Sequence, residues 1–197
     1  VWNYWDKVNK PSTNWLDTLN NDTFWAYTNA PLGYGDNFYI NPIGFGTNPN
    51  NKNITTWYRK TINVNTTTLA DTLELNLMCD DGAVVYVNGT QVLRHNMPAG
   101  VIDSNTLATK NVEGMAEMVF YTYDIPKTAF RNGKNVVALE VHQNSATSSD
   151  AGFDIEIKNR TMAIPTLGAA CTNPNDLHIS CFNSVMPIDK VDSMGIP

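Results

Sequence analysis

The acidic pair Asp80-Asp81 follows an apolar run and precedes Gly82. Carboxylate oxygens are ligands that Ca²⁺ prefers, and Asp150 is a further carboxylate that could join the pair. The same residues suit a β-turn in which an Asp side chain caps backbone amides and the glycine takes a positive φ. The alternating Asp/Asn spacing of a dedicated calcium loop is missing. We therefore favour the turn, keep these three carboxylates as weak calcium candidates and predict no other cofactor.

Glu140 and His142 stand two residues apart in an apolar run typical of a strand, so their side chains share one face. A Glu and a His on one face could act as an acid and a base. No nucleophile motif and no metal-ligand cluster accompanies them. We predict a structural hydrogen-bonding role for the pair and expect that the chain is not an enzyme.

All five tryptophans lie at or before position 57. Exposed aromatic rings stack on sugar faces, so a row of rings would suit glycan binding. Alternatively, the rings cover the protein core and bury their large area there. Because Trp57 and Tyr58 are adjacent on a predicted strand, one of the two must point outward. We favour packing and retain as candidate stacking residues Trp25, Tyr27, Tyr34 and Trp57.

Five Asn-x-Ser/Thr sequons are present in the sequence. In a eukaryotic secreted protein each would be a candidate surface glycosylation site, whereas in a bacterium they mean little. The candidate residues are Asn21, Asn53, Asn65, Asn88 and Asn159. Asn88 is the weakest of these glycosylation candidates, because its place in an Asn-Gly hairpin turn already explains why an Asn is present there.

The three cysteines predict one disulfide and one thiol. Cys171 and Cys181 lie close together in a polar region and are expected to be bonded, while Cys79 lies in an apolar run and is expected to be buried. Two cysteines ten residues apart with His178 nearby do not make a four-ligand zinc pattern.

Composition narrows the class of protein. The chain has 197 residues, with 13 Lys+Arg against 19 Asp+Glu and a net charge of −6. It has no basic stripe for nucleic acid and no apolar stretch long enough to span a membrane. A surface rich in Asn and Thr rather than in ions indicates a secreted or cell-surface protein. The chain starts at Val1 without a signal peptide, as a processed secretory protein would and as a chain that starts late would.

Alternating apolar residues predict an almost entirely β fold. Residues at period two are expected to face the core: Leu75, Leu77, Val85, Val87, Leu139, Val141, Phe153 and Ile155. The predicted strands span residues 55–64, 72–79, 83–87, 91–93, 117–123, 135–143 and 152–157. Turn residues separate them, including the hairpin signal Asn88-Gly89. Strands at this spacing predict an antiparallel sandwich with little helix and at most a helical turn within residues 14–27.

Six segments in this order resemble galactose-binding-like jelly-roll modules of secreted multidomain bacterial proteins. They are APLGYGD (30–36), ITTWYRK (54–60), DDGAVVYVNG (80–89), NMPAG (96–100), NVVALEVHQ (135–143) and SSDAGFDIEI (148–157). The resemblance implies an all-β antiparallel jelly-roll β-sandwich over residues 1–158. Such modules are as a rule non-catalytic, and the fold alone does not fix a function.

Residues 159–197 lie outside this resemblance and read as an extended tail with one extra strand. Its alternating residues, Leu177, Ile179, Cys181 and Val185, would add to the sheet edge of a neighbouring copy. Head-to-tail donation does not close on itself, so it builds a filament or a surface layer. We therefore favour a non-catalytic structural subunit whose partners are copies of itself. The alternative is a carbohydrate-binding module whose partner is a glycan.

Overall fold

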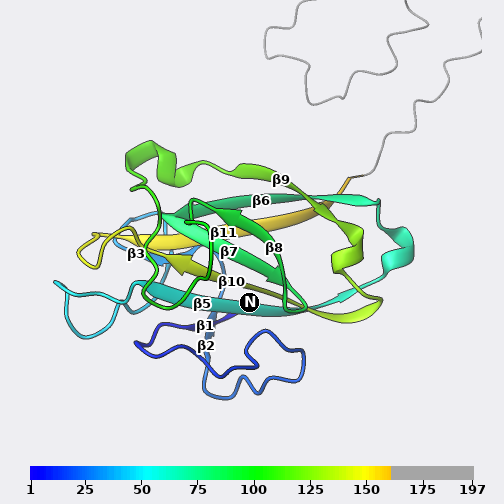
Figure 1. The fold of residues 1–197 in the computed structure, drawn as a ribbon, viewed down its shortest axis with the longest axis horizontal. Helices are drawn as coiled ribbons and strands as arrows, with labels where there is room; N and C mark the ends of the chain where they lie inside the picture. The colour runs from blue at the N-terminus through cyan, green and yellow to red at the C-terminus, as the bar shows by residue number, and fades with distance from the viewer. Residues whose placement is uncertain (161–197) are drawn as a thin grey trace, which may run out of the picture. The chain divides into compact units, whose positions relative to one another are not determined.

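Two β-sheets face each other across an apolar core in the structure, a computed structural model that describes residues 1–160 (Figure 1). The first sheet has the strand order β2 (Ala26–Thr28), β1 (Trp2–Trp5), β5 (Thr55–Val64), β10 (Gly133–His142), β7 (Gly82–Val87) and β8 (Thr90–His95). The second sheet has the order β4 (Asn41–Pro42), β3 (Leu32–Tyr34), β11 (Ala151–Asn159), β6 (Thr72–Asp80) and β9 (Tyr121–Pro126). Three short 3₁₀-helices complete the secondary structure: η1 (Thr66–Thr68), η2 (Gly114–Met118) and η3 (Lys127–Ala129).

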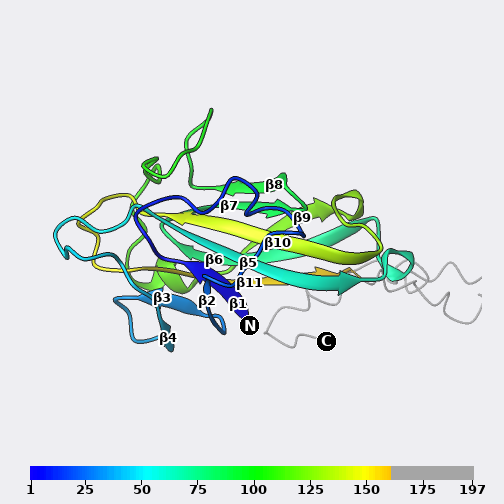
Figure 2. The same ribbon diagram turned by 90° about the horizontal axis from the view of Figure 1, so that it is seen from below.

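The strand order is that of a jelly roll. The four strands β3-β11-β6-β9 of one layer face the four strands β5-β10-β7-β8 of the other. Within each layer, strands from early in the sequence lie beside strands from late in the sequence. All pairs are antiparallel except the short β3–β4 pair. The predicted jelly-roll sandwich is confirmed, and Figure 2 shows its two layers from a second side.

The core lies between the sheets and contains the residues that alternation predicted. Seven of the eight are buried: Leu75, Leu77, Val85, Val87, Leu139, Val141 and Phe153. Ile155 is only half-buried, although it packs against the core. The reason lies in the sheet, because β11 pairs with β3 only from Ala151 to Phe153. Beyond that point β3 no longer flanks β11, and the side chain of Ile155 lies near this open flank.

Most element boundaries follow the sequence pattern. The strand β5 spans the predicted residues, and Asn88 and Gly89 have φ values of 50° and 84°, as the hairpin turn requires. The strand predicted for residues 117–123 is wrong in its first half, because η2 runs to Met118 and β9 begins only at Tyr121. The helical turn expected within residues 14–27 forms only as separate hydrogen-bonded turns, such as Trp15 N–H to the Ser12 carbonyl (3.0 Å).

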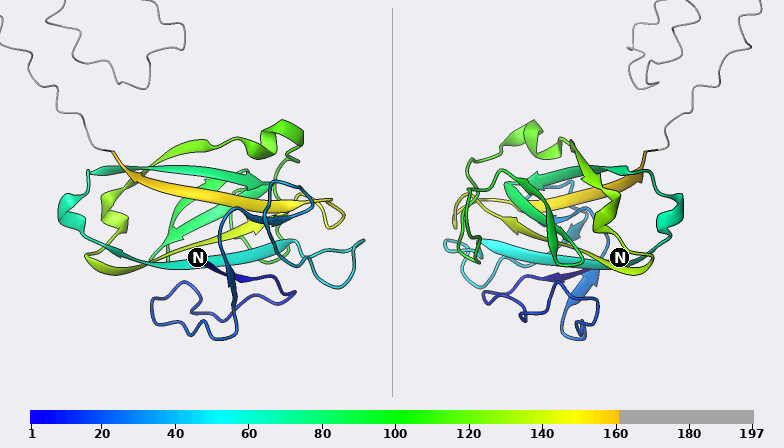
Figure 3. Two further views of the ribbon diagram at one scale, coloured as in Figure 1. Left: turned by 180° about the vertical axis from the view of Figure 1, so that it is seen from behind. Right: turned by 45° about the vertical axis from the view of Figure 1, so that its right-hand side comes forward.

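The segment between β1 and β2 covers the outer face of the first sheet, as the blue chain in Figure 3 shows. Trp15 and Trp25 pack there with Trp57 of β5 in a second, smaller apolar cluster. The buried guanidinium of Arg59 pairs with the Asp22 carboxylate and donates to the Asp17 carbonyl (2.6 Å). An ion pair and an aromatic cluster therefore hold this segment on the sheet.

No helix among residues 1–160 is long and apolar enough to cross a membrane. The predicted Cys171–Cys181 disulfide and the predicted assembly strand with Leu177, Ile179 and Val185 lie outside the described residues.

Replacing Leu139 with Ala should lower the free energy of unfolding by about 2–5 kcal/mol, because its buried side chain leaves a cavity between the sheets. Urea unfolding followed by tryptophan fluorescence measures the loss. The control Ile155→Ala should cost less than half as much, since its side chain is only half-buried. Equal losses for the two variants would contradict the described core.

Candidate functional site

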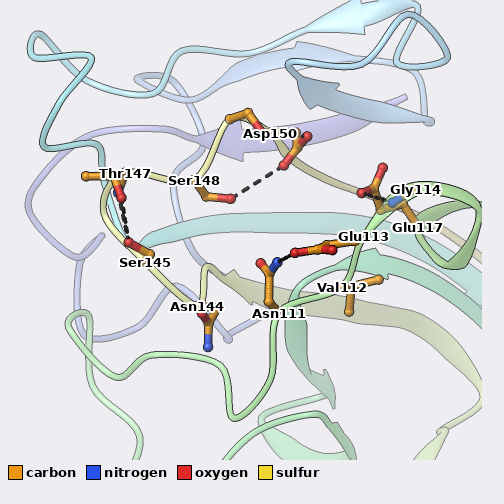
Figure 4. A pocket seen from close by; sticks show the side chains of 11 residues that line it. Asn111, Val112, Glu113, Gly114, Glu117, Asn144, Ser145, Thr147, Ser148 and Asp150 are labelled. Atoms are coloured by element: carbon orange, nitrogen blue, oxygen red, sulfur yellow. Dashed lines mark hydrogen bonds between the residues drawn. The ribbon is translucent and has the colours of Figure 1, made fainter.

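A polar pocket of about 560 Å³ lies at one end of the sandwich, between the loop after β8 and the loop that joins β10 to β11 (Figure 4). Amide, hydroxyl and carboxylate side chains dominate its lining, which consists of Asn111, Val112, Glu113, Gly114, Glu117, Asn144, Ser145, Thr147, Ser148, Ser149 and Asp150. The pocket therefore offers hydrogen-bond donors and acceptors from two loops far apart in the sequence.

Asp81 fixes these two loops to each other. Its fully buried carboxylate accepts the backbone N–H of Val112 through Oδ1 (2.7 Å) and that of Asn144 through Oδ2 (2.7 Å). The Asn96 side chain fixes the loop after β8 further, donating to the carbonyls of Asp81 (2.9 Å) and Lys110 (2.7 Å). The predicted capping of backbone amides by an Asp is thus present, but the amides belong to distant loops rather than to its own turn. The positive φ predicted for Gly82 is wrong, because this residue begins the extended strand β7. Each oxygen of the Asp81 carboxylate accepts a backbone N–H, and Asp81 is not among the clustered carboxylates described below. Asp81 therefore has a structural role, holding the two loops, rather than the role of a calcium ligand.

Three carboxylates gather at the edge of the pocket. Oxygen atoms of Asp36, Glu117 and Asp150 all lie within 4.8 Å of one another. They come from the loop after β3, from η2 and from the residue before β11, and Figure 4 shows Glu117 and Asp150 at the same side of the pocket. The sequence singled out Asp150 but not the other two. Asp36 lies in one of the quoted segments, whereas nothing local in the sequence marks Glu117.

Asp80 lies beside this cluster on the outer side of the second sheet. The preceding residues Leu75, Leu77 and Cys79 face the core, so alternation turns the Asp80 side chain to the opposite face. It is 1% exposed, and neither of its oxygens has a hydrogen-bond partner among the described residues. Burial and then the charges of Asp81 and Asp150 raise the pKa of Asp80 to about 9. The carboxyl is thus buried, unpartnered and surrounded by like charges.

The same crowding acts on Glu117. Burial, followed by a hydrogen bond with the Asp36 carboxyl, raises the pKa of Glu117 to about 7. Its Oε1 also accepts the N–H of Gly114 (2.6 Å), which fixes the side chain within η2. Chemically, this group of carboxylates can hold protons or a cation with oxygen ligands.

Glu140 and His142 form a buried hydrogen-bonding network away from the pocket lining. The Glu140 carboxylate accepts from Trp57 Nε1 (3.2 Å) and Tyr86 Oη (2.6 Å), and His142 Nδ1 contacts the Thr106 carbonyl (2.8 Å). Both residues are at most 3% exposed. The network ties β10 to β5 and β7, which agrees with the structural role predicted for the pair.

The packing favoured for the aromatic residues is observed for three of the four candidates, so the alternative row of stacking rings does not form. Trp25 and Trp57 are buried in the cluster on the outer face of the first sheet, and Tyr34 is buried in the core. The segment after β1 covers these tryptophans, and alternation turns Tyr34 inward. Tyr27 alone is open, 74% exposed on the edge strand β2. One exposed ring does not make a stacking platform.

The sequon residues differ in how free their side-chain nitrogens are. Asn53, Asn88 and Asn159 each donate from Nδ2 to the backbone, to the carbonyls of Asp6, Ala129 and Thr68. Asn21 and Asn65 are exposed and use only Oδ1, to cap their own turns. Asn21 and Asn65 are therefore the most accessible candidates for N-glycosylation.

Comparison with known proteins does not assign the chain to a family. No protein-family profile and no curated protein matches the chain. Among solved structures, it is similar to a β-glycosidase from Bacteroides vulgatus (17% identity, TM-score 0.48, 80% of this chain and 19% of that one). It is also similar to β-glucuronidase 2 of Bacteroides uniformis (16%, 0.49, 80% and 17%) and to a glycosyl hydrolase family 2 member from Bacteroides cellulosilyticus (15%, 0.46, 80% and 20%). The chain spans about a fifth of the length of these enzymes.

Replacing Asp81 with Ala should free the two pocket loops, because two backbone amides lose a charged acceptor worth about 1.5–3 kcal/mol each. Hydrogen exchange at Val112 and Asn144 should accelerate, and the free energy of unfolding should fall by several kcal/mol. As a control, Glu113→Ala at the pocket rim should leave both amides protected, since the Glu113 carboxylate accepts a hydrogen bond from the Asn111 side chain and not from either amide. Protection that persists in Asp81→Ala would contradict the clamp.

Proposed function

We propose that this domain is a non-catalytic binding module of an extracellular protein and that its polar pocket takes a hydroxyl-rich ligand, a glycan. The observation that carries the proposal is the lining: amides, hydroxyls and carboxylates supplied by two clamped loops. Sugar hydroxyls both donate and accept hydrogen bonds, so they suit side chains of these types. The volume of about 560 Å³ lies within the range of small-molecule sites, roughly 300–1,000 Å³.

The side chains at the rim are free to rearrange towards a ligand. Ser148 Oγ makes only a long contact with Asp150 (3.4 Å), and Ser145 and Thr147 hydrogen-bond to each other (2.9 Å). A hydroxyl ligand can replace these contacts at little cost, because each is a local exposed or half-exposed bond. The nearby carboxylates favour a neutral sugar over an acidic one, since like charges repel.

The absence of catalysis in this proposal is supported by the spacing of the acids. Glycosidases that use a carboxylate pair hold it about 5–5.5 Å or about 6.5–9.5 Å apart. Here three acids, Asp36, Glu117 and Asp150, share one cluster with an oxygen of each within 4.8 Å of the others, an arrangement that suits a cation better than a separated catalytic pair. The other acid–base pair, Glu140 and His142, is buried and engaged in the fold.

A glycan array followed by calorimetry with the best-binding neutral oligosaccharide tests the proposal. Asn111→Ala and Ser148→Ala should each weaken binding by about 2- to 13-fold, the loss of one hydrogen bond of roughly 0.5–1.5 kcal/mol. Tyr27→Ala, on β2 outside the pocket, is the matched control and should bind like the parent protein. If only the Tyr27 variant loses binding, the ligand stacks on the exposed ring and the pocket is not the site.

A second candidate function, self-assembly, is favoured by an apolar run beside an open sheet edge. Among residues 1–160, β9 is an edge strand, and exposed Met115, Met118, Val119 and Phe120 lead into it. Exposed apolar residues at a strand edge are typical of sites where another chain adds a strand. On this proposal the donor is the segment with Leu177, Ile179 and Val185 of a neighbouring copy, head to tail.

Deleting residues 161–197 should then yield a folded monomer that no longer assembles, as measured by light scattering. Val119→Asp should also block assembly of the full chain, because a charge would enter the apolar contact. Thr122→Asp places a charge on an exposed position of β9 itself. Comparing it with Val119→Asp shows whether the contact lies at the strand edge or at the apolar run before it. A truncated chain that still forms the same multimer would rule out donation from this segment.

A further inference from the structure

We infer that Asp36, Glu117 and Asp150, with Asp80 behind them, form a Ca²⁺-binding site on the outer side of the second sheet. This inference goes beyond the proposed glycan pocket and does not depend on it. The site joins three chain segments, so cation binding would tie together the loop after β3, the helix η2 and the start of β11.

The spacing of the carboxylates fits one cation. Ca²⁺ binds oxygen ligands at about 2.3–2.6 Å, so two oxygens on the same ion lie at most about 5 Å apart. The oxygens of Asp36, Glu117 and Asp150 meet this limit in every pair, within 4.8 Å. Because the three residues are remote in sequence, the jelly roll and not a local loop sets their spacing.

Independent evidence comes from the buried oxygens beside the cluster. Asp80 is 1% exposed with both oxygens unpartnered, and Tyr39 Oη is likewise buried without a partner. Buried polar atoms in folded proteins nearly always have a partner, because leaving one unpaired costs free energy. A cation at the cluster would supply a partner for these buried oxygens.

The sheet itself places Asp80 next to the cluster. Asp80 of β6 pairs with Gly152 of β11, two residues from Asp150. The helix η2 packs over β6 on the outer side, which brings Glu117 to the same place (Figure 1). Tyr39 lies flat against Gly33 and Gly152, so its ring closes the site from the side of β3.

The donor atoms favour Ca²⁺ over other cations. The group offers carboxylate oxygens from three or four residues, with no His or Cys among the three clustered ligands, which disfavours zinc. Mg²⁺ demands near-ideal octahedral geometry, whereas Ca²⁺ accepts irregular sets of six to eight oxygens. Ligands from three loops make such an irregular set.

Calorimetric titration of the EDTA-treated chain, residues 1–197, with CaCl₂ tests the inference. One Ca²⁺ should bind per chain, and the melting temperature should rise by about 5–10 °C with Ca²⁺ at a hundred times its Kd. MgCl₂ at the same concentration should give a smaller rise. Asp150→Asn and Glu117→Gln should each weaken Ca²⁺ binding at least tenfold. The control Glu156→Gln, an exposed acid on β11 paired with Lys158, should not change it.

The variant Asp80→Asn helps to distinguish a cation bound beside Asp80 from a proton held on its carboxyl. We expect it to gain less from Ca²⁺ than the parent protein, because a carboxylate beside the site is removed. If the parent protein shows no heat of binding and melts at the same temperature with and without Ca²⁺, the inference is overturned and Asp80 holds a proton. Equal stabilisation by Mg²⁺ would overturn the assignment to Ca²⁺. The parent titration decides even where a variant fails to fold.

Discussion

The Asp81 carboxylate, with one oxygen on the Val112 amide and the other on the Asn144 amide, holds the loop end of the sandwich together. Both loops cross from the first sheet to the second, since one joins β8 to β9 and the other joins β10 to β11. Without a shared acceptor, each would be a long surface connection with few apolar contacts of its own. Together with the hydrogen bonds that join Ala108 to Gln143 and Asn144, this buried carboxylate positions the lining of the pocket.

Two buried ionic groups elsewhere in the described domain, Arg59 and Glu140, have hydrogen-bond partners, unlike Asp80. Arg59 pairs with Asp22 and holds the N-terminal segment on the sheet. Glu140 accepts from Trp57 and Tyr86, and so joins three strands of the first sheet. Each of these groups compensates its lost hydration with hydrogen bonds. Asp80 does not, and the carboxylates around it add repulsion rather than compensation.

The alternation of apolar residues and the Asn88-Gly89 turn predicted the strands and the hairpin because these signals are local. The half-burial of Ile155 could not be predicted in this way, since it depends on where the neighbouring strand β3 ends. The burial of Trp25 and Trp57 likewise depends on a segment folded over the outside of a sheet, which strand periodicity does not describe. The cluster of Asp36 and Glu117 with Asp150 needs the complete jelly roll, because no spacing in the sequence brings them together.

Gly33 and Gly152 face each other across β3 and β11, and the Tyr39 ring lies directly on both. A β-carbon at either glycine would stand closer to the ring, and to backbone oxygens, than atoms can approach. These three positions therefore cannot change one at a time. Among natural relatives of this chain, we expect the two glycines and the aromatic residue to be kept or lost together, so the flat patch would be inherited as a unit.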